Sequence, residues 1–357
     1  MSRLAPSPTG DLHLGNLRTF ALNWALARSL GWTLRLRLED LDAPRVKPGA
    51  IEATVDLLRW IGFEHDGPAL RQSSDLAPYR AAMERLAAMG LVYSCGLSRA
   101  ALRRALSAPH VGEREHRCPA SMRPTERSRW RFAAGDVNHR FATPPGSIEI
   151  VDAIAGAHRF DPAEEVGDFV LWTRCDLPSY QLAVVVDDAR QGVTDVVRGD
   201  DLLPSAARQA LLYRALGAPI PRWWHVPLVL GSDGARLAKR ADSRSAWSYR
   251  REGVAPERLV GLLARWLGVV AERAPLSSGE FLAAFASRAD PDAAGATLDG
   301  LGLRPVVFDE EDHRWLLGQP LALALPARIP AGAGCAAPPA APPTSEQRAA
   351  HRAGPAG

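Results

Sequence analysis

The chain has 357 residues, of which 46% are hydrophobic and 23% charged, and its formal net charge is +3. This length allows two or three domains with a real core, and the composition is typical of a soluble globular protein. No apolar run is long enough to span a bilayer, and the four cysteines show no disulfide spacing. The first residues lead directly into a motif and leave no room for a signal peptide, so we expect a cytoplasmic protein without a membrane partner. The mild positive charge permits nucleic-acid binding without demanding it.

Helical and strand patterns alternate over the first ninety residues. Apolar residues recur at helical spacing over 16–30 and alternate in a strand period over 33–38. Further helices are expected over 51–61 and 78–89. This alternation predicts an α/β fold, with a parallel sheet and helices on its faces.

The later pattern divides the chain into parts. Residues 92–165 are rich in Arg, Pro and His, with a strand expected over 147–151, and we interpret them as an inserted subdomain. The sheet is expected to resume at 169–172 and 180–187, and helices are expected over 203–216 and 256–267. The expected parts are 1–91 and 166–235 as the two halves of a nucleotide-binding domain, 236–300 as a lysine loop and short helical region, and 301–357 as a tail, largely disordered from about 329.

One motif near the N-terminus is suited to a nucleotide. The two prolines Pro6 and Pro8 fix φ, and Gly10 allows a sharp turn. His13 follows at an expected helix N-terminus, where phosphate charge is favoured. Gly15 has no side chain, so a flat base could approach the backbone there.

A lysine far downstream is a counterpart to this motif. Only two of the 43 basic residues are lysines, Lys47 and Lys239. Lys239 follows the Gly- and Asp-containing loop 231–234, where a mobile point charge suits a migrating phosphate better than a planar guanidinium does. An ordinary solvated loop lysine is the alternative interpretation.

These strings together resemble a known family. Residues 3–16 resemble the first signature ("HIGH") of class I aminoacyl-tRNA synthetases, and 236–240 resemble a degenerate second signature ("KMSKS"). The stretches 34–45, 180–188 and 192–199 resemble the glutamyl branch, and within it the short-paralogue family of glutamyl-queuosine tRNA(Asp) synthetases. The resemblance covers roughly residues 3 to 270.

The resemblance implies a fold and a reaction. The fold is a class I synthetase Rossmann-like domain with an acceptor-binding-like insertion. The reaction activates L-glutamate with ATP and Mg²⁺, without tRNA, and transfers glutamate to queuosine at the wobble position in the anticodon loop of tRNA(Asp). A monomer is expected. About sixty plausible globular residues follow Lys239, which is too few for the anticodon-binding domain of full-length glutamyl-tRNA synthetases and favours the short paralogue.

The resemblance also assigns site residues. His13 and Lys239 are the expected catalytic residues, His13 at the ATP phosphates and Lys239 at the leaving pyrophosphate. Glu39 is expected at the α-ammonium of glutamate. The remaining expected contacts are Gly15 and Asn16 to ATP, Tyr180 beside the ammonium, Arg3 and Arg198 to the γ-carboxylate, Ser7 through its hydroxyl, and Leu4, Ala5 and Pro6 in the glutamate site.

Some family positions are altered here. Arg236 and Ala238 replace Lys and Ser of the second signature. The family often binds zinc in the insertion, where Cys95 and Cys118 match two ligand positions. Two ligands are too few for a structural zinc site, so we expect two ordinary cysteines. The other two ligand positions hold Leu97 and Arg114, with His110 and His116 nearby as possible substitutes.

Two other functions compete with this interpretation. A truncated synthetase would charge a tRNA 3′ end, and a non-catalytic paralogue would bind tRNA or nucleotide with a degenerate second signature. For single residues, a surface ion pair is the alternative for Glu39 and Arg198. A buried core aromatic with a satisfied hydroxyl is the alternative for Tyr180.

Overall fold

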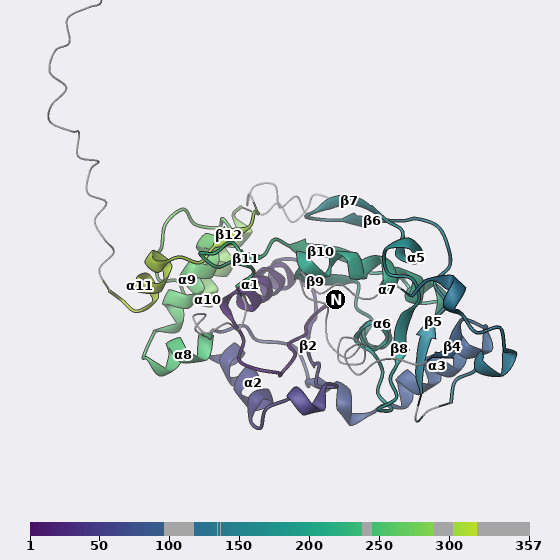
Figure 1. Ribbon diagram of the computed structural model, residues 1–357. Coiled ribbons are helices and arrows are strands. Elements are labelled where there is room, and N and C mark those ends of the chain that lie inside the picture. The colour runs from purple at the N-terminus through teal and green to yellow at the C-terminus, as the bar shows by residue number, and fades with distance from the viewer. Residues whose placement is uncertain (96–117, 134, 136, 238–244, 289–302, 320–357) are drawn as a thin grey trace, which may run out of the picture. The chain divides into compact units, whose positions relative to one another are not determined.

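The computed structural model describes residues 1–95, 118–133, 135, 137–237, 245–288 and 303–319 (Figure 1). Lys239 and Ala238 lie outside these ranges, as does the expected tail from residue 320 onward. The positions expected around zinc at Leu97, His110, Arg114 and His116 lie outside them as well. Within the described ranges, no helix is both long enough and apolar enough to span a membrane.

A three-stranded parallel sheet begins the chain. Its strands are β1 (Ser2–Leu4), β2 (Leu34–Leu38) and β3 (Leu70–Arg71), in that order. Helix α1 (Leu14–Ser29) links β1 to β2, α2 (Ala50–Trp60) lies between β2 and β3 in sequence, and α3 (Ala77–Ala88) follows. The helices expected over 16–30, 51–61 and 78–89 and the strand expected over 33–38 are confirmed to within two residues.

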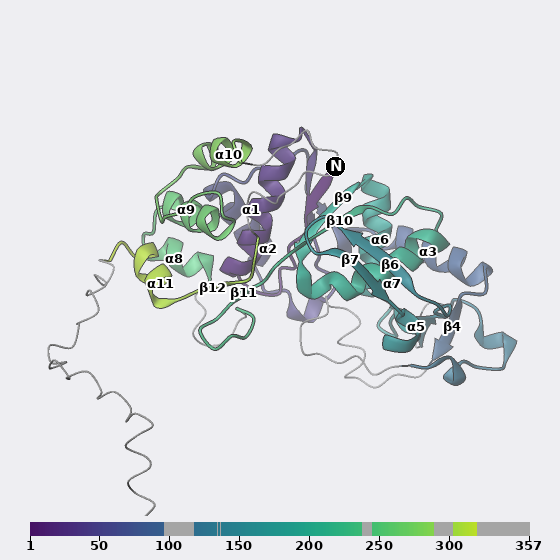
Figure 2. The same cartoon turned by 90° about the horizontal axis from the view of Figure 1, so that it is seen from above.

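A second sheet has the strand order β7-β6-β10-β9. Its strands are β6 (Ile148–Asp152), β7 (Gly156–Phe160), β9 (Asp195–Gly199) and β10 (Arg222–Val226). Strand β10 is parallel to β6 and β9, and β7 is antiparallel to β6. The amides of Thr194 and Asp195 donate to the carbonyl of Met1 at 2.9 and 3.1 Å, which places β1 beside β9 (Figure 2). The expected α/β fold with parallel strands is confirmed, and β6 from the 92–165 stretch belongs to this sheet.

The third sheet is antiparallel. It contains β4 (Val92–Cys95), β5 (Asn138–Phe141) and β8 (Phe169–Trp172), with α5 (Pro162–Glu165) shortly before β8. The expectation that 169–172 resumes the parallel sheet is wrong, because β8 pairs antiparallel with β5. The hydrophobic residues of 169–172 were enough to predict a strand, but they did not indicate which strand it pairs with.

Residues Tyr180–Gln191 form helix α6, and the strand expected over 180–187 is wrong. The Ser179 side chain caps the helix by accepting from the amide of Leu182, and Gly192 ends it in the left-handed region with φ 68°. The residues from Tyr180 to Asp188 are all buried, so the apolar run 182–186 has no polar face. A short apolar run does not distinguish a buried strand from a buried helix.

The remaining described elements are mostly helices. They are α7 (Leu203–Ala215), β11 (Val229–Leu230), α8 (Ala246–Arg251), α9 (Pro256–Trp266), α10 (Ser278–Ala286), β12 (Val306–Val307) and α11 (Glu310–Leu316). The helices expected over 203–216 and 256–267 are confirmed. Residues 303–319 were expected in the tail, but β12 pairs with β11 and α11 follows it.

Arg18 ties helix α1 to three other segments. Its guanidinium is 1% exposed and donates to the carbonyls of Pro227, Trp266 and Arg304 at 2.7, 2.9 and 2.8 Å. Buried carbonyls without partners are costly, and this one arginine satisfies carbonyls of three separate segments. This fixes the start of α1 relative to the chain that leads from β10 to β11.

Candidate active site

A cavity of about 1160 Å³ lies at the carboxyl ends of β1, β2 and β9. Ligands of open α/β sheets bind at this edge. The lining includes most of the residues expected from the sequence: Arg3, Ala5, Pro6, Ser7, His13, Gly15, Asn16, Glu39, Tyr180 and Arg198. Leu4 is not among the lining residues, because its side chain is fully buried in the core. Thus side chains more than 190 positions apart in sequence share one cavity.

His13 is the N-cap of α1. Its Nδ1 accepts a hydrogen bond from the amide of Asn16 at 3.3 Å, so the ring proton of the neutral form lies on Nε2. A Cβ on Gly15 would come within 3.0 Å of that Nδ1. The absence of a side chain at Gly15 therefore keeps the capping position of His13 free of steric conflict.

Glu39 comes immediately after β2 and is held by Arg37 from the same strand. The Nη2 and Nε atoms of Arg37 lie 3.1 and 3.4 Å from Oε1 of Glu39, and the Glu39 side chain is 9% exposed. Burial raises the pKa of Glu39, while Arg37 and Arg3 oppose that rise. The ion pair with Arg37 thus holds the Glu39 carboxylate in place, and Glu39 still lines the cavity.

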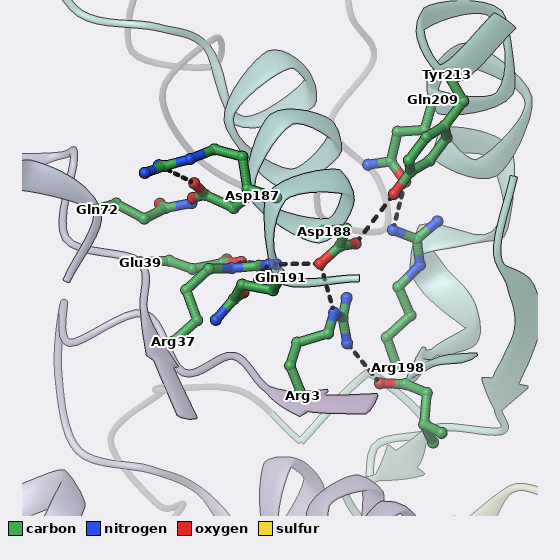
Figure 3. A network of polar contacts seen from close by, with 12 residues as sticks. Arg3, Arg37, Glu39, Gln72, Asp187, Asp188, Gln191, Arg198, Gln209 and Tyr213 are labelled. Atoms are coloured by element: carbon green, nitrogen blue, oxygen red, sulfur yellow. Dashed lines mark hydrogen bonds and ion pairs between the residues drawn. The ribbon is translucent and has the colours of Figure 1, made fainter. Parts of the chain in front are cut away.

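Asp188 on α6 is the centre of a buried charge network (Figure 3). Its Oδ1 accepts from Arg3 Nε at 3.1 Å and pairs with Arg37, and its Oδ2 accepts from the Tyr213 hydroxyl at 3.2 Å. Burial disfavours the charged carboxylate, but Arg37 and Arg3 outweigh burial and lower the pKa of Asp188. The charge of Arg3 is therefore already paired within the protein.

Arg198 on β9 has a different environment. Its Nη1 donates to Gln209 Oε1 at 2.8 Å, its Nη2 to the Leu202 carbonyl at 3.2 Å, and its Nε to His225 at 3.0 Å. The ring of Trp223 lies 4.7 Å from its Cζ. In the part of the chain that the structure describes, no carboxylate is within ion-pair distance of this guanidinium. Burial lowers the pKa of Arg198, and the side chain can bind an anion from the cavity.

Tyr180 begins α6 and is 8% exposed. Burial raises the pKa of its hydroxyl. The hydrogen bonds between described residues do not include this hydroxyl, although the side chain lines the cavity. Tyr180 is thus a buried aromatic that also lines the cavity, and its contact with the substrate stays a prediction.

The chain on either side of 238–244 lies next to the first motif. A turn closed by the bond from the Gly231 amide to the Ala235 carbonyl, 2.7 Å, leads to Leu237, which lines the cavity. On the far side, Ser245 forms a bridge with His13 and donates to Asp11 at 3.1 Å. Both ends of the segment that contains Lys239 are therefore close to the start of α1.

Comparisons with known proteins agree with this geometry. The family model described as "tRNA synthetases class I (E and Q), catalytic domain" matches residues 1–290. The chain belongs to this class I synthetase family. A glutamyl-Q tRNA(Asp) synthetase of Symbiobacterium thermophilum is 45% identical over 79% of this chain and 91% of the relative. One from Rhodobacter capsulatus is 42% identical over 73% of this chain and 100% of the relative. These matches confirm the resemblance found in the sequence and identify a ligase of the class I type.

A longer relative and a solved structure lie in the same family. The glutamate–tRNA ligase 1 of Methylorubrum extorquens is 37% identical over 80% of this chain, but the match covers 60% of that relative. The crystal structure of the glutamate–tRNA synthetase of Elizabethkingia anophelis has a TM-score of 0.68 and 26% identity, covering 88% of this chain and 69% of that one. The expected class I fold is confirmed.

The two cysteines at the family's zinc positions have other partners here. Arg140 Nε lies 3.2 Å from Cys95 Sγ, and the Tyr93 hydroxyl lies 3.8 Å from Cys118 Sγ. Burial raises the pKa of the Cys95 thiol, and a thiolate is the form that binds zinc. Within the described ranges, no three His, Cys, Asp or Glu side chains are grouped to hold a metal ion. The described residues therefore do not fit a four-coordinate zinc site.

Sequence reasoning missed most of the residues that hold the expected contacts in place. Arg37 on β2 and Glu39 directly after it are two positions apart, so the strand period could have paired them. No local pattern connects Arg3 to Asp188 or Arg198 to His225, because the partners come from distant segments. Gln209 and Tyr213, on α7, carried no signal beyond their helical positions.

Proposed function

We propose that the chain activates L-glutamate with ATP, without tRNA, and transfers it to queuosine at the wobble position of tRNA(Asp). In the first step a glutamate carboxylate oxygen attacks the α-phosphorus of ATP, the bond to the β-phosphate breaks, and pyrophosphate leaves. In the second, queuosine takes the glutamyl group and AMP leaves. Magnesium enters with ATP as part of the substrate.

The observation that carries the proposal is the unpaired charge of Arg198 in a cavity that also holds Glu39. A buried cation with only neutral partners is complementary to the γ-carboxylate of glutamate, and a glutamine amide would leave that charge unpaired. Glu39 supplies the opposite charge for the α-ammonium, with Tyr180 beside it. Ser7, Ala5 and Pro6, which follow β1, also line the cavity.

Arg3 has a smaller part in this proposal than Arg198. Its Nε is bonded to Asp188 at 3.1 Å, so its charge is already paired with a carboxylate, whereas the Arg198 guanidinium is bonded to neutral groups. We assign it an auxiliary contact with the γ-carboxylate. The main charge that selects glutamate belongs to Arg198.

At the other end of the cavity, His13, Gly15 and Asn16 bind the ATP phosphates and base. The capping bond fixes the Nε2–H of His13 as a hydrogen-bond donor, which suits a phosphate oxygen. Lys239 neutralises the developing charge of pyrophosphate. Its support is the sequence together with the positions of Leu237 and Ser245 near the first motif.

The acceptor is supported by the relatives named glutamyl-Q tRNA(Asp) synthetase, which the chain matches over nearly their whole length. We infer that the anticodon loop of tRNA(Asp) enters the cavity and that the protein acts as a monomer. The second candidate is transfer to a tRNA 3′ end. It is favoured by the 37% identical glutamate–tRNA ligase of Methylorubrum extorquens.

Labelled glutamate distinguishes the two acceptors. The protein is incubated with ATP, labelled glutamate and tRNA(Asp) with or without queuosine, and with tRNA(Asp) from which the 3′-terminal adenosine has been removed enzymatically. We expect label only with queuosine, and the label persists without the terminal adenosine. Loss of label with the terminal adenosine supports 3′ charging. No label with any tRNA, despite ATP binding, supports a non-catalytic paralogue.

A further inference from the structure

Three polar side chains form a row across neighbouring strands of the second sheet. Arg198 on β9 is the register partner of His225 on β10, and Asp152 ends β6 on the other side of β10. Arg198 Nε lies 3.0 Å from His225 Nε2, and His225 Nδ1 lies 2.5 Å from Asp152 Oδ2. His225 is fully buried and Asp152 is 4% exposed. The row ends in the cavity at Arg198.

The protons in this row have one consistent arrangement. An arginine Nε–H is always a donor, so Nε2 of His225 must accept and its ring proton lies on Nδ1. Asp152 Oδ2 accepts the hydrogen bond that this Nδ1–H donates. Burial lowers the pKa of His225 to about 4, with Asp152 opposing the shift, so the ring is neutral at pH 7.

Asp152 is itself held rigidly. Its Oδ1 accepts from the amides of Ile154 and Ala155 at 2.9 and 2.8 Å, and the His225 amide lies 3.1 Å from both carboxylate oxygens. Its Oδ2 faces the ring of His225. One carboxylate oxygen therefore fixes the β6–β7 turn, and the other fixes the histidine tautomer.

We propose that Asp152 and His225 are positioning residues for glutamate: Asp152 fixes the tautomer of His225, and His225 orients Arg198 without neutralising it. A carboxylate in the place of His225 would also orient the guanidinium, but it would pair with the charge that the substrate needs. A neutral acceptor holds the geometry and leaves the charge available. This inference rests on the proposed role of Arg198 in binding the γ-carboxylate. It also makes the 92–165 stretch, through β6, a contributor to amino-acid selection.

The substitution Asp152→Asn tests the tautomer directly. The amides of Ile154 and Ala155 donate only to the Oδ1 position, so the new amide oxygen stays there and the NH₂ group faces His225 Nδ1. His225 must then carry its proton on Nε2, which opposes the Nε–H of Arg198. The same loss of the correct tautomer follows when a histidine-orienting aspartate of a hydrolase is changed to asparagine. Glu149→Gln, on the exposed face of β6, is the matched control.

Two substitutions of His225 separate the loss of the hydrogen-bond acceptor for Arg198 from the loss of the imidazole ring itself. In His225→Gln the side-chain oxygen reaches the Nε2 position and still accepts from Arg198. In His225→Asn the shorter side chain does not reach it. We expect the glutamate KM in ATP–pyrophosphate exchange to rise about tenfold or more in Asp152→Asn and His225→Asn, and to stay within about threefold in His225→Gln. The ATP KM should change little in all three.

Nitrogen-15 NMR of the histidine rings gives a readout that does not depend on activity. The His225 signal is assigned by its loss in His225→Gln, and we expect the Nδ1–H tautomer in the wild type and the Nε2–H tautomer in Asp152→Asn. A wild-type Nε2–H or doubly protonated ring at pH 7 overturns the proposal. An unchanged glutamate KM despite a reversed tautomer also overturns it. A wild type that exchanges pyrophosphate with no glutamate dependence contradicts the proposed function instead, and the NMR result still decides the tautomer.

Discussion

The two ends of the cavity are built differently. At the amino-acid end, Arg3 and Arg198 are 3% and 5% exposed and come from regular strands, and a buried carboxylate, Asp188, anchors the network. At the end proposed to bind phosphate, the turn 231–234 is largely exposed, and Lys239 lies in the sequence between Leu237, which lines the cavity, and Ser245, which bridges to His13. A rigid charge arrangement suits discrimination between similar amino acids. Under the proposed function, selection and activation therefore depend on different parts of the fold.

The largest effect should come from the buried network of the amino-acid end. Arg37→Leu leaves Asp188 and Glu39 without a shared cation, and breaking a buried pair costs about 3–5 kcal/mol. We expect the free energy of unfolding to fall by that order in urea denaturation. The control is Arg314→Leu, which removes an exposed pair with Glu310 on α11 and should cost under about 1 kcal/mol. Equal losses in both variants would mean that the network is not the stabilising feature described here.

The phosphate end should respond in rate rather than in stability. Lys239→Ala should lower kcat for ATP–pyrophosphate exchange by about 100-fold or more, because its contact forms mainly in the transition state. The glutamate KM should change little. The chain offers a matched control, because its other lysine, Lys47, has an exposed side chain. If Lys239→Ala and Lys47→Ala exchange pyrophosphate at the same rate, Lys239 has no role in the chemistry.

Arg198→Gln should alter amino-acid choice. Charge-assisted hydrogen bonds are worth about 1.5–3 kcal/mol, so kcat/KM for glutamate should fall at least about tenfold. Discrimination against glutamine should fall with it. Steady-state exchange with each amino acid measures both effects, and Arg159→Gln on the exposed strand β7 is the control. Unchanged kinetics in Arg198→Gln would place this side chain outside the substrate site.

Gly15→Ala should give the smallest effect. The new Cβ would lie 3.0 Å from His13 Nδ1, so the ring must shift by a few tenths of an ångström. We expect kcat to fall several-fold, which corresponds to an increase of about 1 kcal/mol in the activation free energy because His13 is displaced. Gly279→Ala on α10 is the control, because its Cβ meets no atom closer than 4.0 Å. A Gly15→Ala enzyme as active as the control would show that the position of His13 is not critical.

The sequence predicted the elements and the cavity residues better than their connections. Helix α1 follows from its apolar spacing, and His13, Glu39 and Arg198 follow from strings that resemble family signatures. Helix α6 could not be predicted as a helix, because its apolar residues are buried on all sides and show no helical period. The partners Asp188, His225 and Asp152 could not be predicted, because strand order and register bring them together. The role of Lys239 stays a prediction from sequence.

The most direct test is ATP–pyrophosphate exchange by the wild-type protein without tRNA, with glutamate or glutamine as the amino acid. The account requires that the glutamate site is already formed, with the charge of Arg198 available to the γ-carboxylate, before any tRNA binds. It predicts exchange with glutamate and little or none with glutamine. Exchange that requires tRNA, or that proceeds equally with glutamine, would contradict it.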